Sequence, residues 1–156
     1  MSNIVELPEY EGCFACGRDN PVGLKLDFKY DRDQEEVFAH FNLDERYIGF
    51  NDVLHGGILS TAADDAMAWS AMIRTNNLCL TKNLEIEFLM PGKPHADYTV
   101  RAACKLLDEN TVLARASIVS DRGKVIVKAQ SRFMQLRGRR SRAFKEQYNL
   151  EAIHGI

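Results

Sequence analysis

The sequence predicts an α+β fold in which a curved antiparallel sheet of five to six strands wraps around one long helix. Two observations predict it. Apolar residues alternate with polar ones in several short segments, which is the pattern of half-buried strands. In residues 56–73 they recur instead at helical spacing. A single amphipathic helix among so many strands buries its apolar side most economically against the sheet, so we expect the sheet to curl around it.

The elements follow one another in the order β-β-α-β-β-β-β. The first two strands are expected at residues 24–30 and 37–43, joined by the polar turn 31–34. The helix follows over residues 56–73. Turn sequences rich in Pro, Gly, Asp and Asn then separate four more expected strands, at residues 80–90, 98–107, 111–120 and 125–136.

The length of 156 residues fits one domain, residues 1–156, with one core. Residues 1–23 form an N-terminal loop with a C-x-x-C motif, and residues 137–156 form a basic C-terminal tail. Five of the nine residues 137–145 are basic and none is acidic. We interpret this cluster as a solvated terminal segment rather than a phosphate or nucleic-acid contact, because no interleaved aromatic residues accompany it.

Charge and hydropathy exclude several classes of partner. A net charge of −2 argues against a nucleic-acid or anionic-membrane partner. No apolar stretch approaches the roughly 18 residues of a membrane span, and the acidic N-terminus is unlike a signal peptide, so we expect a cytoplasmic protein. Four cysteines are too few for a disulfide scaffold.

The entrance to the expected helix carries two adjacent glycines, Gly56 and Gly57, directly after His55. Glycine is costly within a helix, but in the first turn it lets a ligand oxygen approach an unpaired backbone N–H at the positive end of the helix dipole. The pattern is compatible with an oxyanion site at the Gly57 amide. It is also compatible with a tight loop-to-helix corner that binds nothing.

A carboxylate on the same side of the helix favours the functional interpretation. At 100° per residue, Asp64 falls on the side of Gly57, among small residues against which a second helix could pack closely. Asp65 lies about 100° further round, and we expect it to be an ordinary carboxylate at the rim of the helix.

These residues resemble the hotdog-fold acyl-CoA thioesterases, with the closest likeness to the phenylacetate-pathway type. The resemblance is carried by the triplet His55-Gly56-Gly57, by Asp64 nine residues after the histidine, and by residues 80–91. It implies a hotdog fold and a homodimer, or a homotetramer built as a dimer of dimers. It also implies that an acyl-CoA thioester is the substrate, hydrolysed at the shared interface.

The resemblance also implies roles for individual residues. The Gly57 amide would polarise the thioester carbonyl, and Asp64 would activate water or attack the carbonyl directly. His55 would fix the carbonyl end of the substrate or the loop, and the Thr81 hydroxyl would orient the water or the carboxylate. The nucleophilic and general-base roles of Asp64 both remain open.

Substrate-binding roles are expected for Gly56 and for Asn51, which loosely matches an amide or acid that some members place before the histidine. The chemistry requires no metal or cofactor, because a thioester is already activated and the oxyanion can be stabilised by backbone amides. Cys13-x-x-Cys16 is half of a zinc pattern without a second pair, so we expect it to pack the N-terminal loop.

The same fold could carry two other functions. The first is a non-catalytic acyl-CoA-binding or sensor protein, against which the presence of Asp64 and Thr81 argues. The second is a dehydratase or hydratase, which would bring a different acid and histidine pattern. Ser60 and Ser70 lack the G-x-S-x-G context of a serine hydrolase.

Overall fold

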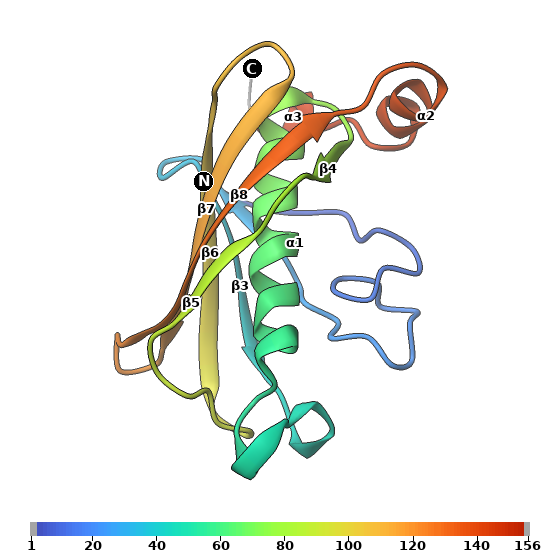
Figure 1. The fold of residues 1–156 in the computed structure, drawn as a ribbon. Helices are drawn as coiled ribbons and strands as arrows, with labels where there is room; N and C mark the ends of the chain where they lie inside the picture. The colour runs from blue at the N-terminus through green and yellow to red at the C-terminus, as the bar shows by residue number, and fades with distance from the viewer. Residues whose placement is uncertain (1–2, 155–156) are drawn as a thin grey trace.

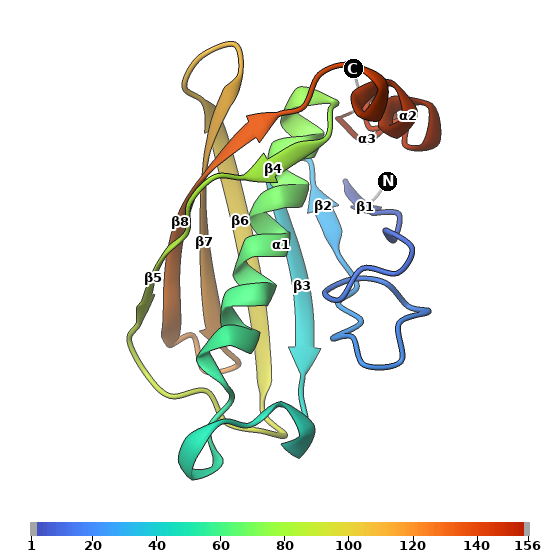
Figure 2. The same ribbon diagram turned by 45° about the vertical axis from the view of Figure 1, so that its right-hand side comes forward.

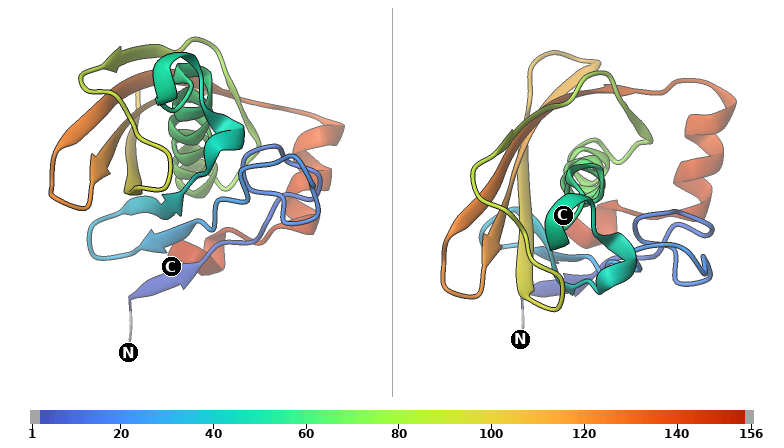
Figure 3. Two further views of the ribbon diagram at one scale, coloured as in Figure 1. Left: turned by 90° about the horizontal axis from the view of Figure 1, so that it is seen from below. Right: turned by 60° about the horizontal axis from the view of Figure 1, so that its bottom comes forward.

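The computed structural model describes residues 3–154 and has the predicted hotdog architecture. One long helix, α1 (Gly56–Thr75), lies in the concave face of a curved antiparallel sheet (Figures 1 and 3). The fold class predicted from the two periodicities is therefore confirmed.

Within residues 3–154 the sheet contains eight strands, two more than predicted, because a short strand at one edge lies in the expected N-terminal loop and the expected strand 80–90 is divided in two. Its strands are β1 (Ile4–Glu6), β2 (Lys29–Asp31), β3 (Glu36–Asn42), β4 (Cys79–Thr81), β5 (Glu85–Phe88), β6 (Asp97–Leu106), β7 (Thr111–Ser120) and β8 (Val125–Gln135). Their order in the sheet is β1-β2-β3-β6-β7-β8-β4, and β5 also pairs with β8. The remaining elements are the 3₁₀ turns η1 (Glu45–Tyr47) and η2 (Phe50–Asp52), and the helices α2 (Arg139–Gln147) and α3 (Glu151–His154).

Packing against the core stabilises helix α1. Five of its ten buried residues are Ala or Ser, among them Ala62, Ala63 and Ala66, which let the sheet approach the helix backbone closely. The helix ends at Asn76, whose left-handed conformation (φ 47°) is one that Asn tolerates well. In the described part of the chain, no helix combines the length and apolar character needed to cross a membrane.

The expected strand 80–90 is two strands, because Asn83 interrupts the hydrogen-bond ladder. The Asn83 side-chain Oδ1 accepts the backbone N–H of Arg132 at 2.8 Å, and its carbonyl oxygen accepts the Ser131 hydroxyl at 2.5 Å. Side-chain groups thus replace the backbone pairs that would continue the ladder. The chain bends here, and β4 passes across the front of α1 while β5 continues along β8 (Figure 2).

The expected strand 24–30 is shortened to β2 because its first half pairs elsewhere. The backbone N–H groups of Leu24 and Leu26 donate to the carbonyls of Phe14 and Ala15, at 2.8 and 2.9 Å. The N-terminal loop is therefore a packed part of the core that lies beside α1 (Figure 2).

The C-terminal segment is not a solvated tail, because it forms the helices α2 and α3 and packs on the core. The interpretation of residues 137–145 as a solvated terminal segment was therefore wrong. The basic side chains of the segment are exposed as expected, but Phe144, Tyr148 and Leu150 are buried. Tyr148 stacks on Tyr10 of the N-terminal loop and meets Trp69 of α1 edge-on, with ring centroids 5.6 and 6.4 Å apart. Ser141 and Phe144, three residues apart in α2, are its buried residues, so one side of a strongly basic helix packs against the core.

Candidate active site

The N-terminus of α1 is closed by His55, which is the N-cap residue. The imidazole Nδ1 accepts the backbone N–H of Gly57 at 2.8 Å. Because an amide N–H can only donate, Nδ1 is unprotonated, and the neutral ring carries its proton on Nε2. This hydrogen bond is consistent with the predicted role of His55 in fixing the loop, which stays a prediction.

The two glycines have different surroundings. A Cβ on Gly56 would lie 3.2 Å from Cζ of Phe88 in β5, so this position is glycine because an aromatic ring packs on its backbone. Gly57 is exposed, and it lines an open hollow of about 410 Å³ together with His55 and Tyr47. The packing of Phe88 explains why residue 56 is glycine without any need for a ligand. The predicted contact of Gly56 with substrate stays a prediction.

The predicted carboxylate and hydroxyl are brought together. Thr81, the last residue of β4, donates from Oγ1 to Oδ1 of Asp64 at 2.9 Å. Burial raises the pKa of the half-buried Asp64 carboxyl, and the Thr81 hydrogen bond acts against that shift by stabilising the anion. The bond also fixes one carboxylate oxygen and leaves the other available to a water or a substrate.

Within one chain, Asp64 and the Gly57 amide are not adjacent. Seven residues of α1 separate them, which is about 10 Å along the helix axis. Asp64 is accordingly absent from the residues that line the hollow at Gly57.

Asn51 lies in η2, in the loop before His55. It is exposed and adopts a left-handed conformation, with φ 58° and ψ 41°. Asn is one of the few residues that accept this geometry, so the turn itself explains its presence. Its predicted contact with substrate has no support from within the chain.

The structure corrects the prediction for Asp65, which is not a rim carboxylate. The N-terminal loop covers it, and its Oδ1 lies 3.9 Å from the thiol sulfur of Cys13. Its Oδ2 is buried and has no hydrogen-bond partner within residues 3–154. Burial and the nearby Cys13 sulfur raise the pKa of Asp65 to about 7. A helical wheel could not show this, because the covering loop comes from fifty residues earlier in the chain.

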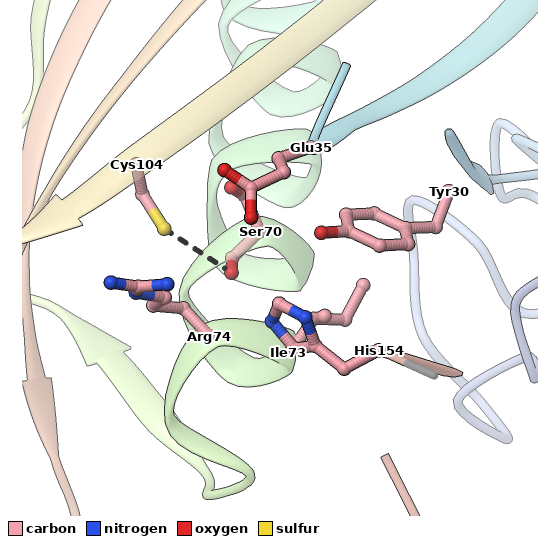
Figure 4. A pocket seen from close by; sticks show the side chains of 7 residues that line it. All are labelled: Tyr30, Glu35, Ser70, Ile73, Arg74, Cys104 and His154. Atoms are coloured by element: carbon pink, nitrogen blue, oxygen red, sulfur yellow. Dashed lines mark hydrogen bonds between the residues drawn. The ribbon is translucent and has the colours of Figure 1, made fainter. Parts of the chain in front are cut away.

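A separate pocket near the C-terminal end of α1 is too small for substrate. It has a volume of about 20 Å³, and Ser70, Arg74 and Cys104 are among the seven residues around it (Figure 4). The Cys104 thiol donates to the Ser70 carbonyl at 3.3 Å across this space. Such a volume holds one water molecule at most.

Comparison with known proteins finds one matching family model and many solved structures with a similar fold. Residues 51–127, which include the entrance of α1, Asp64 and Thr81, match the family model described as the thioesterase superfamily. The predicted resemblance to the thioesterase superfamily is confirmed. No curated protein matches this chain.

Solved structures share the fold. The Escherichia coli PaaI protein from the phenylacetic acid degradation operon is 19% identical, with a TM-score of 0.65 over 74% of this chain and 82% of that one. A hypothetical thioesterase protein from Streptococcus pneumoniae, in a structure with coenzyme A, is 22% identical, with a TM-score of 0.62 over 68% and 84%. A putative, phenylacetic acid degradation-related thioesterase from Ralstonia eutropha is 21% identical, with a TM-score of 0.62 over 71% and 85%.

Proposed function

We propose that the protein hydrolyses an acyl-CoA thioester to the free acid and CoA. The observation that carries this proposal is the half-buried Asp64 carboxylate, which accepts a hydrogen bond from Thr81. It lies on the helix whose N-terminus carries the exposed residue Gly57. The superfamily match supports a thioester substrate, and the coenzyme A in the Streptococcus pneumoniae structure supports acyl-CoA in particular.

The reaction needs two things from the protein. The carbonyl oxygen must be stabilised as negative charge develops on it, which backbone N–H groups at a helix N-terminus do well. A carboxylate must also take a proton from the attacking water, or attack the carbonyl carbon itself. In both routes the C–S bond breaks and CoA leaves as a thiol. After direct attack, water then hydrolyses the acyl–Asp64 anhydride, which releases the acid and restores the carboxylate. Gly57 and Asp64 have the chemistry for these two roles.

His55 controls access to the Gly57 amide under this proposal. The N–H that would bind the oxyanion is already bonded to Nδ1 of His55. The substrate carbonyl oxygen must therefore share this N–H with the imidazole or displace it. Either way, the histidine fixes the direction in which the amide points until the substrate arrives.

A homodimer would complete the site. Apolar side chains are exposed along β4, β5 and the segment after them, on the side of α1 where Thr81 contacts Asp64 and Phe88 contacts Gly56. They are Leu80, Leu84, Phe88, Leu89 and Met90. Two copies related by a twofold axis would cover this surface and place antiparallel α1 helices together, with Asp64 of one facing Gly57 of the other. A homotetramer built as a dimer of dimers would contain the same pairs.

The proposal is tested by thiol release from a panel of acyl-CoAs. Asp64→Asn should abolish turnover while acyl-CoA binding and the fold persist, because the amide has nearly the same shape but is neither base nor nucleophile. Asp121→Asn, which changes an exposed carboxylate in the turn between β7 and β8, is the matched control and should keep wild-type activity. Asp64→Asn activity within about threefold of wild type, a difference under roughly 0.7 kcal/mol, would contradict the mechanism.

One observation favours a second candidate, a non-catalytic acyl-CoA-binding or sensor protein. It is the occupied Gly57 amide, which is bonded within the chain. The same panel separates the two functions: binding of acyl-CoAs without thiol release from any of them would support the sensor.

A further inference from the structure

We propose that Cys13, Cys16 and Asp65 bind a zinc ion, separately from the thioester site. The sequence offers only half of a zinc pattern, and the fold supplies a third ligand from the middle of α1. One ligand atom from each of the three side chains lies within 4.8 Å of the other two.

The distances suit a small tetrahedral ion. Ligand atoms bound to zinc through sulfur at about 2.3 Å and oxygen at about 2.0 Å lie roughly 3.5 to 3.8 Å from one another. The Cys13 sulfur is already 3.9 Å from Oδ1 of Asp65. Modest side-chain movements would bring all three atoms to zinc distances.

The loop holds the two thiols in place without a metal. The Cys16 N–H points at the Cys13 sulfur at 3.4 Å, and the Gly17 N–H donates to the Cys13 carbonyl at 3.0 Å. A Cβ on Gly17 would lie 2.7 Å from Cys13 backbone atoms, so the tight turn requires glycine there. N–H groups directed at a sulfur are also the outer contacts that stabilise a metal-bound thiolate.

Asp65 provides the second, independent observation. Its Oδ2 is buried without a hydrogen-bond partner, and none of the ion pairs found within residues 3–154 includes Asp65. A buried carboxyl oxygen without a partner is costly, and a bound cation would remove that cost. Loop packing alone accounts for the cysteines but gives no reason for a carboxylate beneath them.

Zinc is the ion that fits this donor set. Two thiolates select a soft or borderline metal, and a carboxylate oxygen is an ordinary third zinc ligand. Three protein ligands leave one tetrahedral position for water. The ion would link the N-terminal loop to α1 from the side opposite β5 (Figure 2), so we expect it to stabilise the fold and take no part in hydrolysis.

The test is metal analysis of the full-length protein purified under reducing conditions without chelator. We expect about one zinc ion per chain, which a chromophoric chelator removes and added zinc restores, with a matching fall and rise in Tm. Cys16→Ser and Asp65→Asn should lower the zinc content to near zero. If either variant fails to fold, the zinc content and zinc-dependent Tm of the wild type still decide the question.

Two matched controls are available in the chain. Cys104→Ser removes a partly buried thiol elsewhere, and Asp64→Asn removes the neighbouring carboxylate, so both should keep a full complement of zinc. Wild-type protein that binds no zinc, a Cys13–Cys16 disulfide in the reduced preparation, or equal zinc loss in the controls would each overturn the proposal.

Discussion

A site shared between two protomers can be tested by combining two inactive variants. Asp64→Ala removes the carboxylate, and Gly57→Pro removes the backbone N–H. Proline is acceptable at this second helical position, because first-turn N–H groups have no partner within the helix. The preceding residue, Gly56, has no Cβ to clash with the proline ring. Each variant alone should be inactive.

The expected recovery follows from the length of α1 between the two groups. At about 10 Å apart along one helix, Gly57 and Asp64 of the same chain cannot both contact one thioester carbon and its attacking water. In mixed dimers, one of the two composite sites receives a Gly57 amide from one chain and Asp64 from the other. Random pairing makes about half the dimers mixed, so activity should return to about one quarter of wild type.

The assay is thiol release after the two variants are refolded together in equal amounts. Mixed dimers are confirmed by two different affinity tags, and each variant is checked for a native circular dichroism spectrum. Loss of the His55 contact in Gly57→Pro should cost about 1 kcal/mol of stability, as for other N-cap losses. Zero activity in demonstrably mixed dimers would refute the shared site, because a site within one chain predicts no recovery.

Two further predictions concern individual side chains. Thr81→Val removes the hydroxyl that donates to Asp64 and should lower kcat about fivefold, near 1 kcal/mol for one partly exposed hydrogen bond. Thr75→Val, which removes a hydroxyl bonded within α1, should leave kcat unchanged, and equal losses in both would contradict the role of Thr81. Burial raises the pKa of the Cys79 thiol to about 11, so at neutral pH it should remain unalkylated in the folded protein. Peptide mapping by mass spectrometry checks this, and rapid modification of native Cys79 would show that the prediction is wrong.

The sequence predicts those parts of the fold that depend on local periodicity. Helical spacing predicts a helix over residues 56–73, and the helix is Gly56–Thr75. The strands β3, β6, β7 and β8 lie within one residue of their predicted bounds. Asp64 and Thr81 were assigned to one site from the resemblance, and the structure joins them by a hydrogen bond.

The parts that were missed depend on contacts between distant segments. The break at Asn83 arises because its side chain pairs with β8, and nothing in residues 80–90 alone indicates this. Asp65 is predicted at the rim of the helix because a helical wheel contains only the residues of that helix. It cannot show that the N-terminal loop, an irregular segment from elsewhere in the chain, covers this carboxylate. Phe88 was not connected with Gly56, because the contact depends on where β5 crosses the helix.

Trp69 is the single tryptophan of the chain and lies where its two ends meet α1. It is 1% exposed, and through Tyr148 its surroundings include both the N-terminal loop and the C-terminal helices. Its fluorescence therefore reports on how these terminal segments dock, whereas far-ultraviolet circular dichroism is dominated by the sheet and α1. If the two signals change together during denaturation, the terminal segments and the central layer unfold as one cooperative unit. If the fluorescence changes first, the terminal segments detach before the sheet unfolds.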